Sequence, residues 1–253
     1  MIKTILARHR QGHRTISYPR EPAALPELFR GYPRLSSERC PADCDCCVAA
    51  CPVGALSLRG ALSLDLGKCL FCPDCATACP HDAIGFTPDA PLATRRREEL
   101  LVTAGEERRL TTALDRELLR LFGRSLKLRE VSAGGCNACE ADTNVLSTIG
   151  FDLGRFGIQF VASPRHADGL VVTGPVSENM REALLKTYTA IPAPKLVIAL
   201  GACAINGGPF INSPEVHNGV DGLLPVDLYI PGCPPHPVTI LDGLLRLLGR
   251  LPS

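Results

Sequence analysis

The chain has 253 residues, 45% of them hydrophobic, and a formal net charge of +1, which suits a globular protein of one large or two modest domains. A near-neutral charge gives no support to nucleic-acid binding, and a chain without Trp is poorly equipped to stack on bases. No apolar run reaches the roughly 18 residues that a membrane span requires. The first twenty residues lack a secretory signal, so the 13 cysteines are expected in a reducing compartment, the cytosol, as metal ligands rather than disulfides.

Residues 1–35 are expected to form an extended arm ahead of the cysteine-rich part of the chain. Its first twenty residues carry five basic side chains before any acidic residue appears, and they are Lys3, Arg8, Arg10, Arg14 and Arg20. Such an arm could be a solvated tail or a segment that packs along other subunits.

A duplicated cysteine-rich run covers residues 40–80. Residues 69–80 follow the pattern C-x2-C-x2-C-x3-C-P, and residues 40–52 repeat it with one extra residue after Cys40. This spacing is typical of two 4Fe–4S clusters, because each loop supplies three ligands to one cluster and its fourth cysteine to the other. Zinc also binds C-x2-C pairs but would not require the doubled pattern. We therefore predict one cluster on Cys40, Cys44, Cys47 and Cys79, and its twin on Cys51, Cys69, Cys72 and Cys75.

The run resembles the bacterial two-cluster ferredoxin over about residues 36–88, and we expect a ferredoxin-like domain over residues 36–93. Cys46 has no partner in the repeat. We interpret it as a packed thiol beside the lengthened loop, although it could replace Cys44 as a ligand.

Residues 94–123 are expected to link this domain to the next one. Part of the linker should be a charged helix, and the default interpretation of Arg95, Arg96 and Arg97 is a solvated helical face.

From about residue 124 the pattern changes to short apolar runs that alternate with helical segments. Strands are predicted at residues 126–131, 158–161, 170–173, 196–200 and 226–230. A helix is predicted over residues 178–191, with Ser177 as its N-cap, and a second over residues 238–248, entered through Pro235 and Pro237. Strands that alternate with helices predict a parallel α/β sheet over residues 124–253.

Four further cysteines follow the ends of predicted strands. Cys136 and Cys139 come after the first strand, Cys203 after the fourth and Cys233 after the fifth. Parallel strands end at one edge of a sheet, where open α/β folds build their sites, and flanking Gly or Pro lets the backbone approach a bulky group. Buried apolar thiols would explain one such cysteine but not four at one edge. We therefore predict that these four hold a third 4Fe–4S cluster.

The motifs GGCNACE, LVIALGACAINGG and VDLYIPGCPPHP together resemble the small subunit of NiFe hydrogenases and the related cluster-bearing subunit of respiratory complex I. The resemblance covers about residues 126–250 and implies a flavodoxin-like domain whose four cysteines hold the proximal cluster, facing a large catalytic subunit. The complex I branch has adjacent cysteines in the first motif, whereas Asn137 and Ala138 separate them here, which favours the hydrogenase side. The N-terminal half is similar to the ferredoxin-like subunit of formate-hydrogenlyase-type, energy-converting hydrogenases. The chain thus looks like a fusion of two subunits, which makes packing of its basic arm along partner subunits the favoured interpretation.

Three other residues are candidates for a role beside the clusters. Glu140 directly follows a predicted ligand and could carry protons at the subunit interface, although an interface or N-cap carboxylate is an equal alternative. His217 and His236 are interpreted as orienting a loop or tuning a cluster, because four cysteines already complete the site. No catalytic residue is expected in this chain, and the absence of a G-x-G-x-x-G motif argues against nucleotide binding.

The resemblance therefore implies an electron-transfer subunit with three 4Fe–4S clusters in a membrane-associated NiFe hydrogenase, peripheral to the inner face of the cytoplasmic membrane. Its expected partners are the NiFe large subunit, which would hold the catalytic centre, and further hydrophilic and membrane subunits. One alternative is the equivalent subunit of a complex I-like assembly without nickel, beside a 49 kDa-type subunit. Another is a free-standing soluble electron carrier, which predicts a stable holo-monomer.

Overall fold

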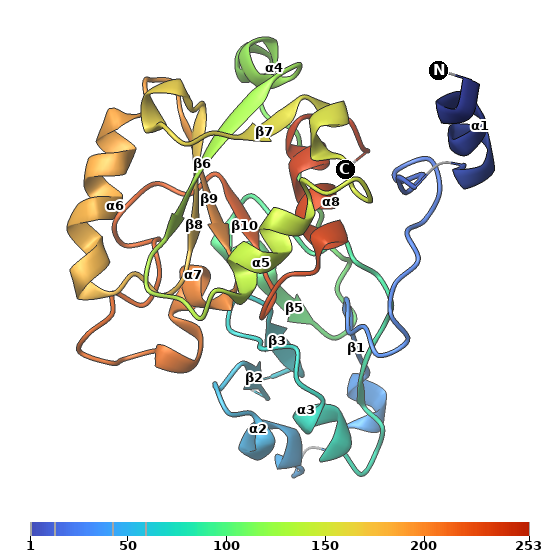
Figure 1. Ribbon diagram of the computed structural model, residues 1–253. Coiled ribbons are helices and arrows are strands. Elements are labelled where there is room, and N and C mark those ends of the chain that lie inside the picture. Colours follow the sequence, from blue (N-terminus) through green and yellow to red (C-terminus); the bar gives the residue numbers. More distant parts are fainter. Residues whose placement is uncertain (1, 13, 42, 59, 253) are drawn as a thin grey trace.

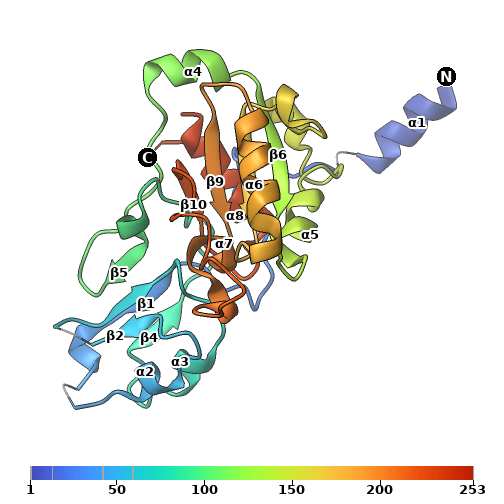
Figure 2. The same ribbon diagram turned by 90° about the vertical axis from the view of Figure 1, so that its left-hand side faces the viewer.

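The computed structural model describes residues 2–12, 14–41, 43–58 and 60–252 of a mixed α/β protein (Figure 1). Its first helix, α1 (Ile2–Gln11), has no buried residue and projects from the body of the molecule in Figures 1 and 2. The first part of the predicted extended arm is therefore helical. The chain then returns to the body, where the backbone N–H of Ile16 donates to the carbonyl of Gly150 at 2.9 Å.

Residues 33–103 form two small antiparallel sheets with two short helices. The elements are β1 (Pro33–Leu35), the 3-10 helix η1 (Ser37–Arg39), α2 (Cys46–Ala50), β2 (Leu56–Ser57), β3 (Ser63–Asp65), α3 (Asp74–Thr77), β4 (Ile84–Phe86), the 3-10 helix η2 (Arg97–Leu100) and β5 (Leu101–Thr103). Strand β1 pairs with β4, while β3 pairs with both β2 and β5. Helices α2 and α3 begin 28 residues apart, as do β2 and β4, so the sequence repeat is also a structural repeat.

The start of the predicted linker belongs to this small segment rather than to a free helix. Strand β5 continues the β2–β3 sheet, and two guanidinium nitrogens of Arg97 each donate to a carboxylate oxygen of Asp65 at 2.8 Å. The expected solvated helical face is wrong for Arg97, because its charge pairs with a carboxylate distant in the sequence. The linker does contain the helix α4 (Arg116–Phe122), and Asp115 caps that helix by accepting from two backbone N–H groups.

The second half of the chain contains a five-stranded parallel sheet, as predicted. Its remaining elements are β6 (Leu126–Ser132), α5 (Ala138–Val145), η3 (Leu153–Phe156), β7 (Ile158–Phe160), η4 (Pro164–His166), β8 (Gly169–Thr173), α6 (Glu178–Ala190), β9 (Leu196–Leu200), α7 (Ala202–Asn206), η5 (Gly208–Phe210), β10 (Leu228–Ile230) and α8 (Pro237–Leu247). The strand order is β10-β9-β8-β6-β7, which in chain order is the 2-1-3-4-5 arrangement of flavodoxin-like sheets. The last strand begins two residues later than predicted, at Leu228.

Side-chain alternation along the central strand β8 divides the core into two layers. Leu170 and Val172 belong to the cluster that includes Leu184 of α6, whereas Val171 belongs to the cluster that includes Leu244 of α8. Helices α6 and α8 therefore cover opposite faces of the sheet, as Figure 1 shows. Burial on both faces explains why the strands are continuous apolar runs.

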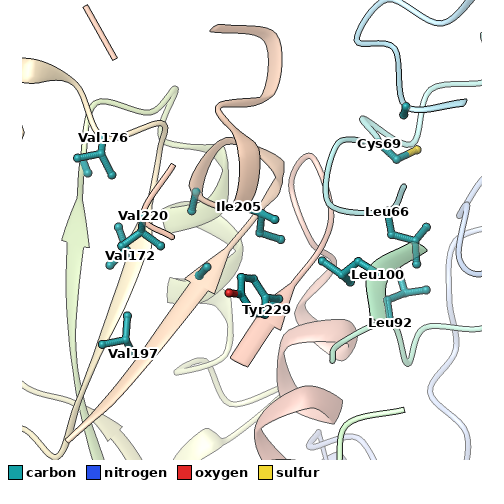
Figure 3. Close-up of a cluster of buried hydrophobic side chains, with 14 of the residues drawn as sticks. Leu66, Cys69, Leu92, Leu100, Val172, Val176, Val197, Ile205, Val220 and Tyr229 are labelled. Atoms are coloured by element: carbon teal, nitrogen blue, oxygen red, sulfur yellow. The ribbon is translucent and has the colours of Figure 1, made fainter. Parts of the chain in front are cut away.

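The two halves of the chain share one of these core layers. Figure 3 shows Leu66 and Leu100 of the small segment in the same buried cluster as Ile205 and Tyr229. The backbones of Thr94 and Tyr229 also exchange two hydrogen bonds, of 3.0 and 2.9 Å. The small segment consequently packs against the edge of the parallel sheet where the strands of that sheet have their carboxyl ends (Figures 1 and 2).

Candidate metal centres

The four dispersed cysteines meet at the carboxyl edge of the parallel sheet. Burial raises the pKa of the Cys139 thiol far above its usual range, and Glu140 and the thiols of Cys203, Cys233 and Cys136 raise it further. Burial, with Cys233, Cys136 and Glu140, likewise raises the pKa of Cys203 to about 11. These four thiols, Cys136, Cys139, Cys203 and Cys233, form what we call the edge set. Cys136 and Cys139 follow β6, which lies between β7 and β8 at the point where connections leave the sheet in opposite directions.

Two glycines leave space around the edge set. A Cβ atom on Gly201, which has φ +90°, would lie 2.6 Å from Sγ of Cys139. A Cβ atom on Gly208, at φ +54°, would lie 2.8 Å from Sγ of Cys203. A side chain at either position would collide with a thiol, so these glycines fit a site that holds a bulky sulfur-ligated group.

The eight cysteines of the small segment separate into two further sets. Burial, followed by the Cys44 and Cys79 thiols, raises the pKa of Cys40, while the pKa of Cys47 is raised by burial, Cys40 and Cys79. The outer set therefore consists of Cys40, Cys44, Cys47 and Cys79.

The middle set brings the remaining repeat cysteines together. Burial raises the pKa of Cys69 to about 12, and neighbouring thiols of Cys75, Cys51 and Cys72 add to the shift. Burial, Cys72, Cys51 and Cys47 raise the pKa of Cys75 to about 11. The middle set is thus Cys51, Cys69, Cys72 and Cys75. Each set combines three cysteines of one loop with the fourth cysteine of the other.

Backbone N–H groups donate to sulfur within the two sets of the small segment. The N–H of Ala55 lies 3.2 Å from Sγ of Cys51, and 28 residues later the N–H of Ala83 lies 3.3 Å from Sγ of Cys79. The N–H of Phe71 donates to Sγ of Cys69 at 3.3 Å. Such bonds favour the thiolate, and in iron–sulfur proteins they tune the cluster potential.

The three sets form a series. Cys47 of the outer set is close enough to raise the pKa of Cys75 in the middle set. Cys72 of the middle set raises the pKa of Cys233 in the edge set, after burial and Cys136. Cys72 and Cys233 also line a common cavity of about 410 Å³. The middle set therefore lies between the other two.

Cys46 is exposed, contrary to the prediction of a packed thiol. It is the first residue of α2, and the next residue, Cys47, occupies the buried side of that helix. A hydrogen bond with the Cys44 thiol is the largest cause that raises the pKa of Cys46.

Glu140 lies inside the protein rather than on an open face. Its side chain is 6% exposed, and Oε1 accepts from the hydroxyl of Thr173 at 2.6 Å. Burial raises its pKa, but hydrogen bonds from Ser132 and Thr173 outweigh that effect and leave the pKa below its usual value. Glu140 is therefore an anion in the fold.

Glu130 is a half-buried carboxyl that sequence reasoning missed. Burial raises its pKa to about 7, and the charge of Glu140 adds to the rise. Its Oε1 is buried without a hydrogen-bond partner. The available signal was its place in LKLREVS, where Leu126, Leu128 and Glu130 share one side of β6.

The two histidines have local roles. Nδ1 of His236 accepts from the backbone N–H of Val238 at 3.2 Å and caps α8, and burial lowers the pKa of the imidazole. His217 lies 2.5 Å from the carboxylate of Glu178. Across the described ranges, no three His, Cys, Asp or Glu side chains converge to hold a single metal ion. Those ranges also include no helix with the length and apolar character of a membrane span.

Comparison with known proteins identifies the family to which the chain belongs. Residues 136–247, which include the edge set, match the family model described as NADH ubiquinone oxidoreductase, 20 Kd subunit. The chain is 40% identical over 150 residues to the probable membrane-bound hydrogenase subunit mbhJ of Pyrococcus furiosus, covering 59% of this chain and 90% of that protein. It is 45% identical to formate hydrogenlyase subunit 7 of Escherichia coli, over 53% of this chain and 52% of that protein.

Two further proteins are similar to part of the chain. An NADH-quinone oxidoreductase subunit from Clostridium beijerinckii is 46% identical over 46% of this chain and 70% of its own length. A chain of the archaeal membrane-bound sulfane sulfur reductase is 33% identical, with a TM-score of 0.47 over 54% of this chain and 75% of that one.

The fold and the matched segment define a subunit of the hydrogenase and complex I class of oxidoreductases. The chain belongs to the NADH ubiquinone oxidoreductase 20 Kd subunit family, which confirms the resemblance drawn from the motifs around Cys136, Cys203 and Cys233.

Proposed function

We propose that this chain is the iron–sulfur electron-transfer subunit of a membrane-associated NiFe hydrogenase. In this proposal it lies at the inner face of the cytoplasmic membrane, beside a large subunit that carries the NiFe site and further hydrophilic and membrane subunits. Relatives named as membrane-bound hydrogenase and formate hydrogenlyase subunits support the choice. The observation that carries the proposal is the series of three four-thiol sets, because a series of redox centres is what an electron-relay subunit requires.

Each set is proposed to hold one 4Fe–4S cluster. Four thiols are the usual ligands of such a cluster, and they are the donors in all three sets. A bound cluster accepts and donates single electrons. The proposed domains are a ferredoxin-like domain over residues 36–93, a linker over residues 94–123 whose β5 joins that domain's sheet, and a flavodoxin-like domain over residues 124–253.

The chain's own residues set the environment of the proposed clusters. The thiols of Cys69 and Cys75 belong to buried residues, and that of Cys139 belongs to a half-buried one. The N–H groups of Ala55 and Ala83 donate to sulfur at corresponding positions of the repeat. Burial and hydrogen bonds to sulfur are the means by which a protein adjusts cluster potential.

A complex I-like subunit whose partner lacks nickel is the second candidate. The name of the matching family model and the 46% identity to an NADH-quinone oxidoreductase subunit favour it. The spacing of Cys136 and Cys139 favours the hydrogenase, because the resemblance gives the complex I branch adjacent cysteines.

Iron and nickel analysis of the purified native complex tests the proposal. We expect about twelve irons per chain from three cubane clusters, in addition to the iron of the NiFe site, together with nickel in the co-purified large subunit. A measured content of about eight irons per chain would rule out one of the three proposed clusters. Twelve irons without nickel would select the complex I-like function, and a stable holo-monomer on size exclusion would favour the free-standing carrier.

A further inference from the structure

We propose that Phe29 and Arg30 act as a clamp that fixes the separation between the middle set and the edge set. The inference rests on the proposed function, because it concerns the step between the clusters that these sets would hold. Phe29 and Arg30 are consecutive residues, and each contacts a loop that carries one of the two facing cysteines, Cys72 and Cys233.

Arg30 holds the loop of the middle set. Its Nε donates to the carbonyl of Phe71 at 2.5 Å. Phe71 lies between Cys69 and Cys72 and has φ +54°, in the left-handed region that a bulky side chain rarely adopts. Such a conformation is costly and persists only where surrounding contacts hold it. Arg30 supplies such a contact on the carbonyl side of Phe71, while the Phe71 N–H donates to Sγ of Cys69 on the other.

Phe29 holds the loop of the edge set. Its ring meets the imidazole of His236 edge-on, with centroids 5.3 Å apart and planes at 71°. His236 lies three residues after Cys233, and its Nδ1 accepts from the backbone of α8, which fixes the imidazole at the head of that helix. Phe29 therefore rests on a part of the Cys233 loop that the sheet domain already holds rigid.

The two contacts meet at the gap between the sets. Phe29, Arg30, Phe71, Cys72 and Cys233 all line the cavity of about 410 Å³ that separates the loops. Electron tunnelling slows steeply as the distance between redox centres grows. A small shift of the Cys72 loop would therefore change the rate of electron transfer more than it changes the binding of the clusters. Phe29 and Arg30 are positioning residues, since they act on the cysteine loops and not on the clusters themselves.

Magnetic coupling between reduced clusters tests the clamp without recourse to hydrogenase activity. Electron paramagnetic resonance of the reduced, full-length holo-chain should show splitting from the interaction between the middle and edge clusters. We expect Arg30→Ala and Phe29→Ala to lose or broaden that splitting while the iron content per chain stays at the wild-type value. Glu27→Ala changes an exposed side chain of the same segment and should leave the spectrum unchanged.

The outcomes separate the clamp from the proposed function. Wild-type splitting in both alanine variants would overturn the clamp and leave the three-cluster proposal standing. A wild-type chain without the clusters would overturn both. Should Arg30→Ala lose iron, the milder variants Arg30→Lys and Phe29→Leu decide the question. Altered splitting at full iron content supports the clamp, and an unchanged spectrum in both refutes it.

Discussion

The hydroxyl of Tyr18 donates a 2.7 Å hydrogen bond to Oδ1 of Asp242 and so joins the N-terminal segment to α8. Asp242 is 1% exposed, and its Oδ2 accepts from Nε of Arg246 at 2.8 Å. Burial and the bond to Asp242 raise the pKa of Tyr18 above its usual value, so the hydroxyl keeps its proton and remains a donor.

Tyr18→Phe should therefore destabilise the fold. The variant removes one donor from a buried carboxylate, which costs about 1–3 kcal/mol of the free energy of unfolding. Urea unfolding measures the loss. Tyr188→Phe, on the partly exposed α6, is the matched control. Equal losses of unfolding free energy in the two variants would show that the hydrogen bond from Tyr18 to Asp242 does not itself stabilise the fold.

Gly67→Ala should loosen the packing between the two halves of the chain. An added Cβ would lie 2.7 Å from Cζ of Arg97 and 2.8 Å from Cγ2 of Ile205. Overpacking of this kind costs about 1–3 kcal/mol, and we expect a lower unfolding midpoint. Gly222→Ala adds a methyl group where no heavy atom lies within 4 Å and should leave the midpoint near the wild-type value. A Gly67→Ala variant as stable as wild type would contradict the close packing at this point.

Removal of one thiol from the middle set should remove the cluster that we propose for that set. In Cys72→Ala we expect the iron content to fall from about twelve to about eight per chain, because a cubane needs its full ligand set. Cys46→Ala should keep the full count, since each of the three sets already has four thiols without Cys46. Loss of iron in Cys46→Ala would make Cys46 a ligand in place of Cys44, and full iron content in Cys72→Ala would contradict the assignment of Cys72 to the middle set.

Glu130 should make stability fall as pH rises. The folded chain has a Glu130 pKa of about 7 against an ordinary value of 4.5, because burial and then Glu140 disfavour its charge. The folded state binds this proton more tightly than the unfolded state. The contribution of the protonated Glu130 carboxyl to the free energy of unfolding is therefore complete below pH 4.5 and is lost as pH rises through about 7.

Glu130→Gln should remove that dependence. We expect the variant to gain up to about 2 kcal/mol over wild type near pH 8.5, after allowing for partial exposure, and less near pH 6. Urea unfolding at both pH values measures the difference. Glu117→Gln, on the exposed side of α4, should follow the wild-type curve. A wild-type slope in Glu130→Gln would show that another group governs the change.

The parallel sheet could be predicted from the sequence, because strands that are buried on both faces are continuous apolar runs, as in Leu196–Leu200. It also placed Cys203 and Cys233 at one edge, since each follows directly on a strand. Short-range spacing was sufficient for both inferences.

Contacts between segments that lie far apart in the sequence could not be predicted from short-range spacing. Strand β5 has three residues, too few for alternation to appear, and its place depends on pairing with β3. The ion pair of Arg97 with Asp65 joins residues 32 positions apart. The orphaned oxygen of Glu130 likewise depends on which side chains surround β6 once the chain has folded.

The buried layer shared by Leu66, Leu100, Ile205 and Tyr229 has a consequence for how the protein can move. A hinge between the small segment and the parallel sheet would have to expose these side chains to water, at roughly 1.5–3 kcal/mol for each. Opening and closing of one half against the other is thus suppressed. Any change of shape in this protein must therefore keep the small segment and the parallel sheet together as one unit.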